Sequence, residues 1–140
     1  MSSDAEHFQQ DLARLSREGA RSERIASRAA LAWRNVYAAL SPIIGHGGFM
    51  ALFKRSVSMT RTTHPWLASM QEDFEQSGDF AVLEAAFSQQ ASEEAAAANS
   101  AVLQKFIGIL TSLIGESLAE RLLSPVWDDR SIDDMRETSP

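Results

Sequence analysis

The sequence contains no cysteine, which excludes disulfide bonds, thiolate nucleophiles and thiolate metal sites. It also lacks the signals of a β-protein, because it has no Asn-Gly or Asp-Gly turn and no sustained alternation of apolar and polar residues. The first twelve residues contain no apolar segment of the kind that a secretory signal needs. We therefore expect a cytoplasmic protein built from helices.

Long hydrophobic runs are missing as well. The longest, residues 106–115, has about half the length that crosses a bilayer, and Lys105 and Glu116 flank it, so we expect no membrane insertion. With 140 residues, of which 44% are hydrophobic, the chain is long enough to bury one core. We expect a single helical domain over residues 4–127, with flexible tails at 1–3 and 128–140.

Charge is divided unevenly along the chain. Residues 1–66 carry nine basic and five acidic side chains, whereas residues 67–140 carry four basic and fourteen acidic ones. Opposite signs of this kind can pair within the fold or between subunits. Because phosphate neutralisation dominates binding to nucleic acids, an acidic chain without a basic stripe is not expected to bind them.

Apolar residues recur at helical spacing almost throughout, which predicts a bundle of four or five helices. The first helix is expected over residues 4–17, where Gly19 stops it, and the second begins near Ser22. Pro42 predicts a kink or break near Ser41. The GHGG sequence at 45–48 is expected to end the pattern, and a third helix follows over residues 49–62.

The second half of the sequence is predicted to be helical as well. The His64-Pro65 pair ends the third helix, because the residue before a proline avoids the helical region. A short amphipathic segment follows over residues 66–75, and Asp79 is the predicted N-cap of a fourth helix. The strongest helical pattern comes last, over residues 91–123, with glutamates at its start.

This long C-terminal amphipathic helix carries the prediction of a partner. Unbroken, it would measure about 50 Å, which is long for a globule with a radius of gyration of about 14 Å. Either the helix bends at Gly115 or a partner chain covers its far end. The expected interface consists of its apolar face and one tryptophan near the end of the domain: Val102, Phe106, Ile109, Leu110, Leu113 and Trp127.

Residues 44–66 combine glycines, histidines, arginines and a tryptophan, and they contain the candidate ligand site. The amides of the GHGG turn could approach an anion, since a helix N-terminus favours negative charge. Arg55 and Arg61 lie in the helix that follows and His64 closes it. With His46, Gly47 and Gly48 they form the predicted pocket. The nucleotide-binding patterns GxxxxGK[ST] and GxGxxG are absent. The alternative is a tight turn that needs positive φ, with arginines that pair with the acidic half.

The histidines offer further alternatives. Histidine phosphotransfer proteins are helical bundles of this size, but the residue three positions after His46 is Phe49 rather than a lysine. No paired histidines and no HExxH motif occur, so we expect no metal site. We expect no cofactor, although a haem with His46 or His64 as its single axial ligand stays open. Glu93 and Glu94 point apart on a helix and are interpreted as charges that favour its N-terminus.

These observations favour a non-enzymatic regulatory or interaction module, of the kind found in bacterial signalling, that forms a homodimer or another homo-oligomer or binds a second protein. The alternative is a sensor of small ligands or anions that uses the GHGG turn, Arg55, Arg61 and His64. A histidine phosphotransfer protein is the less favoured third reading. No nucleophile elbow GxSxG occurs, and we expect no enzymatic activity.

Overall fold

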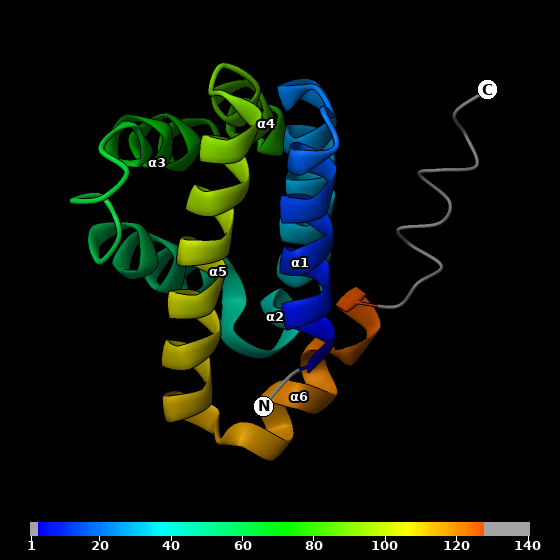
Figure 1. The fold of residues 1–140 in the computed structure, drawn as a ribbon. Coiled ribbons are helices and arrows are strands. Elements are labelled where there is room, and N and C mark those ends of the chain that lie inside the picture. The colour runs from blue at the N-terminus through cyan, green and yellow to red at the C-terminus, as the bar shows by residue number, and fades with distance from the viewer. Residues whose placement is uncertain (1–2, 128–140) are drawn as a thin grey trace.

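The computed structural model describes residues 3–127, and every regular element in this range is a helix (Figure 1). The all-α prediction is therefore confirmed. The predicted tails lie outside the described residues, except that Ser3 belongs to the first helix. The elements are α1 (Ser3–Arg17), α2 (Ser22–Ser58), α3 (Trp66–Ser77), α4 (Phe80–Ser88), α5 (Ser92–Ile114), α6 (Glu116–Leu123) and a 3-10 turn, η1 (Ser124–Trp127).

Three long segments make the body of the fold. Figure 1 shows α1, the first part of α2 and α5 with their axes aligned, α1 running opposite to the other two, with α4 across one end and α6 across the other. The second part of α2 leaves this body and leads to α3 on one side. The first part of α2 is the central segment, since its residues from Ile25 to Leu40 supply much of the buried core.

Local signals explain most helix ends. Gly19 follows α1 with a φ of +88°, and Gly78 follows α3 in the left-handed region, where the absence of a Cβ makes that conformation accessible. Asp79 caps α4 as predicted, because its side chain accepts a hydrogen bond from the amide of Ala81 at 2.9 Å.

The break in α2 lies at Gly45, and the prediction of a kink near Ser41 is wrong. Pro42 stays inside the helix, whereas Gly45 has a φ of +78° and a ψ of 167°. A residue with a side chain would be strained at this φ, so the chain turns at the first glycine after the proline. The expectation that the whole GHGG sequence interrupts the helix is also wrong, since helical structure resumes directly after Gly45.

The predicted long C-terminal helix is wrong too, because Gly115 divides it. This glycine has a φ of +92° and a ψ of 153°, so α5 ends at Ile114 and the last helix, α6, has only eight residues. The bend was one of the two alternatives that the length of the pattern allowed. It folds α6 back, so that Ala119 and Leu123 are buried within this chain.

The core is aromatic at its centre. Trp33 of α2 packs edge-on against Phe53 and Phe106, with ring centroids 5.1 and 5.2 Å apart. Its indole nitrogen donates a hydrogen bond of 2.7 Å to the side-chain oxygen of Asn99, which is fully buried in α5. This bond fixes α5 against α2, because a buried donor without an acceptor is costly.

By length and composition, α2 and α5 could each cross a membrane, with mean hydropathies of 1.4 and 1.3 over their most apolar windows. This is weak evidence, since central helices of water-soluble folds meet the same criterion. Both helices line the core of this fold.

Candidate functional site

The structure does not bring the six predicted ligand-binding residues into one pocket. His46 is exposed just after the Gly45 break, where its Nδ1 lies 3.1 Å from the hydroxyl of Tyr37. Arg61 is exposed in the segment between α2 and α3, and His64, in the same segment, is only 8% exposed. Within this set, Gly48 and Arg55 line a common surface, which is the groove described below.

Gly47 and Gly48 do not form a phosphate cradle of the predicted kind. Both have negative φ and belong to α2, so they are helical residues rather than parts of an open loop. A Cβ at Gly48 would lie 3.0 Å from the Cβ of Ile44, so this glycine allows the two sides of the break to approach each other. Its role here is close packing.

His64 takes part in a polar cluster with Glu94 and Trp66. Its Nδ1 lies 2.6 Å from Oε2 of Glu94, and the indole nitrogen of Trp66 donates to the same oxygen at 2.8 Å. Because an ionised carboxylate only accepts hydrogen bonds, Nδ1 of His64 carries the proton in this contact. The cluster joins the segment between α2 and α3 to the first turn of α5.

The environment of Glu94 favours its charged form. Partial burial alone would raise the pKa of Glu94, but the hydrogen bonds from Trp66 and His64 and the charge of His64 together lower it. A carboxylate at this position repels other anions. The residues around His64 are therefore arranged to bind the protein's own glutamate, and they do not offer an anion site.

A second feature is an open apolar groove between the part of α2 after Gly45 and the last turns of α5. We call it the α2–α5 groove. Its volume is about 500 Å³, and its side chains are apolar except for one arginine and one serine. The residues that line it are Ile44, Gly48, Ala51, Leu52, Arg55, Ile109, Leu110, Ser112, Leu113 and Ile114.

Large apolar side chains are exposed on and near this groove. Leu113, on its wall, is 67% exposed, and Ile43, beside Ile44, is 59% exposed. Leu118 of α6 is 40% exposed, and α6 follows directly on α5 at the same end of the molecule (Figure 1). Exposed apolar side chains that gather around a hollow are typical of a binding surface.

The structure divides the predicted interface residues between the chain's own core and the α2–α5 groove. Val102, Phe106 and Leu110 are each 1% exposed or less, because α1, α2 and α6 of the same chain cover that face of α5. Trp127 is 8% exposed and packs on Phe8 of α1, with ring centroids 5.7 Å apart. These four residues belong to the chain's own core. The other two, Ile109 and Leu113, line the α2–α5 groove.

Sequence reasoning missed the acceptor in the polar cluster. Glu94 was interpreted as a helix-terminal charge, which it also is, but its two donors lie 28 and 30 residues away. No spacing rule connects residues so far apart. The sequence offers one signal for this cluster. His64 and Trp66 flank Pro65, so two side chains that can donate hydrogen bonds lie close together in the chain.

Comparisons with known protein families, with characterised proteins and with solved structures found no match to this chain. Among residues 3–127, no group of three or more histidine, aspartate or glutamate side chains is placed to hold a metal ion.

Proposed function

We propose that the protein is a non-enzymatic regulatory module of the cytoplasm that associates with a second copy of itself through the α2–α5 groove. The observation that carries this proposal is Leu113, a large apolar side chain that is 67% exposed on the wall of an apolar hollow. A monomer gains nothing from this arrangement, whereas burial of one such side chain contributes about 1.5–3 kcal/mol to association.

The combination of a hollow with protruding side chains suits self-association. In a two-fold dimer each copy presents the same surface, so Leu113 of one copy can enter the groove of the other and the contact occurs twice. Ile43 and Leu118 lie on neighbouring elements and would extend the contact. The single charged residue of the groove, Arg55, is exposed, so pairing need not bury a charge.

Arg55 also supports a second candidate function, the binding of an amphipathic carboxylate. Such a molecule would place its hydrocarbon chain in the groove and its carboxylate at Arg55, which makes the protein a sensor of small ligands. This reading keeps two residues of the predicted anion site, Gly48 and Arg55, and replaces the remainder with apolar contacts.

Light scattering coupled to size-exclusion chromatography, over about 1–100 μM protein, tests the first proposal. We expect a dimer for the unmodified chain and a monomer for Leu113→Glu. Ala85→Glu is the matched control, because Ala85 is exposed on α4 and the substitution adds the same charge away from the groove. A folded, monomeric unmodified chain over this range would contradict the proposal. A rise in melting temperature with a long-chain carboxylate, lost in Arg55→Gln, would then favour the sensor.

A further inference from the structure

Three arginines around the α1–α2 turn make a second surface with no assigned role. Arg17 ends α1, and Arg21 and Arg24 lie one helical turn apart at the start of α2. All three are exposed, and none of them forms an ion pair with another residue of the range 3–127. Arg14 differs, because Asp11 and Glu18 pair with it at 3.3 and 3.4 Å.

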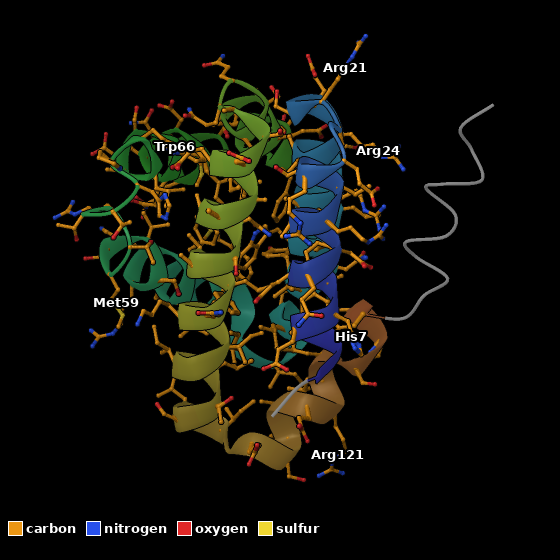
Figure 2. The ribbon with its side chains drawn as sticks, in the orientation of Figure 1. His7, Arg21, Arg24, Met59, Trp66 and Arg121 are labelled. Atoms are coloured by element: carbon orange, nitrogen blue, oxygen red, sulfur yellow. The ribbon has the colours of Figure 1, made fainter. Side chains whose placement is uncertain are left out.

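This arginine surface, defined as Arg17, Arg21 and Arg24, borders a hollow. A space of about 540 Å³ is lined by residues 19–21, Glu23 and Arg24. Figure 2 shows Arg21 at the turn and Arg24 on the side of α1 and α2, both pointing away from the body. The N-terminus of α2 adds positive potential here, since the side chain of Arg21 does not cap it. Glu23 is the one acidic side chain in the lining.

The described part of the chain ends on the same side of the molecule. Trp127 is held in place by its packing on Phe8, and Figure 2 shows His7, the neighbour of Phe8, on the side that also carries Arg24. Along α1, Phe8 and Arg17 are about 14 Å apart. The described part of the chain therefore ends beside Phe8, about 14 Å along α1 from Arg17.

The sequence that follows Trp127 has the complementary charge. Residues 128–140 contain five acidic and two basic side chains, and four of the acidic ones form the pairs Asp128-Asp129 and Asp133-Asp134. Thirteen residues can span up to about 43 Å, which exceeds the distance to be covered. Because the segment is attached to the fold, its effective concentration at the arginines is high.

We propose that the acidic segment 128–140 binds the arginine surface of its own chain. The contact is electrostatic and reversible, since exposed ion pairs are individually weak and salt screens them. It covers three positive charges that have no ion-pair partner among residues 3–127. The segment thereby shields these arginines from other anions, and a stronger polyanion would have to displace it.

Paramagnetic broadening in the full chain tests this proposal. The absence of cysteine allows one nitroxide label to be attached through Ser131→Cys. We expect loss of amide signal centred on residues 17–24, and recovery of that signal in about 1 M salt, where the screening length falls to about 3 Å. We expect the same recovery when Arg21 and Arg24 are both changed to Gln. Changing Lys54 and Arg61 to Gln removes equal charge from exposed positions outside both surfaces and should leave the broadening intact.

Three results would overturn the proposal. One is broadening that is uniform or centred away from residues 17–24. Another is broadening at residues 17–24 that survives both high salt and the Arg21/Arg24 change. The third comes from a mixture of labelled chains with unlabelled, isotope-enriched chains: signal loss there would show that the segment binds a different copy. The double arginine variant alters two exposed side chains, so helicity by circular dichroism should confirm that it folds.

Discussion

The substitution Glu94→Gln should measure how firmly the polar cluster holds α5 to the segment that follows α2. Glutamine keeps an oxygen acceptor for Trp66 and His64 but removes the charge. A hydrogen bond to a charged group contributes about 1.5–3 kcal/mol and a neutral one about 0.5–1.5 kcal/mol, so two bonds would lose about 2 kcal/mol together. The side chain of Glu94 is 37% exposed, and solvent reduces the loss to about 1–2 kcal/mol.

Urea unfolding followed by far-ultraviolet circular dichroism measures this loss, and the melting temperature should fall by about 3–8 °C. Glu93→Gln is the matched control, since Glu93 is the exposed neighbour in the same helical turn and contributes only about 0.3 kcal/mol through the helix dipole. Equal losses for the two variants would refute the assignment of Glu94 to the cluster.

The pH dependence provides an independent check of the same cluster. Because the pKa of Glu94 is lower in the folded chain than the usual 4.5, the folded state holds its proton less tightly than the unfolded state does. The contribution of the Glu94 carboxylate to the free energy of unfolding is therefore complete above pH 4.5. It is lost as the pH falls through the pKa that Glu94 has in the folded state. The stability gap between the unmodified chain and Glu94→Gln should be constant near neutral pH and close in acid. A gap of the same size at all pH values would mean that ionisation of Glu94 is irrelevant.

Two further predictions concern the backbone break and the buried hydrogen bond. Gly45→Ala should destabilise the fold by about 1–2 kcal/mol, because alanine is strained at a φ of +78°. Gly47→Ala, at an open helical position, should instead stabilise it by up to about 1 kcal/mol. Equal effects of the two substitutions on thermal unfolding would contradict the placement of the break at Gly45. Asn99→Ala should lower the free energy of unfolding by about 1–3 kcal/mol, because it leaves the indole N–H of Trp33 without an acceptor. In the Trp33→Phe background, which has no such N–H, the same change should cost less, and a double-mutant cycle measures the difference.

Much of the fold follows from local patterns in the sequence. The stripe of Phe8, Leu12 and Leu15 predicts α1 and its buried face, and Asp79 predicts the start of α4, because apolar spacing and caps act within a few residues. The rule for proline gave the wrong break in α2. Pro42 predicts a disturbance, but the residue that turns is the one that accepts positive φ, and that is Gly45.

The candidate site could be predicted only in part, because it depends on which elements meet. Arg55, Arg61 and His64 are close in sequence, yet Arg55 lines the groove while His64 turns toward Glu94. The apolar stripe of the last helix indicates burial but does not say which chain provides the cover. That distinction separates Phe106, which packs on Trp33 of the same chain, from Leu113, which remains exposed.

One long-range feature could nevertheless have been read from the sequence. From Ser22 to Ile44 the first part of α2 has the same number of residues as α5, from Ser92 to Ile114, and a glycine with positive φ follows each. The two segments start at the same end of the molecule, where the Ser22 hydroxyl donates a hydrogen bond to the carbonyl of Ser88 at 2.8 Å. Helices of equal length that start together and run side by side must also end together. Ile44 and Ile114 therefore lie at the same height along the paired helices. The α2–α5 groove opens there, where both helices of the chain end at a glycine.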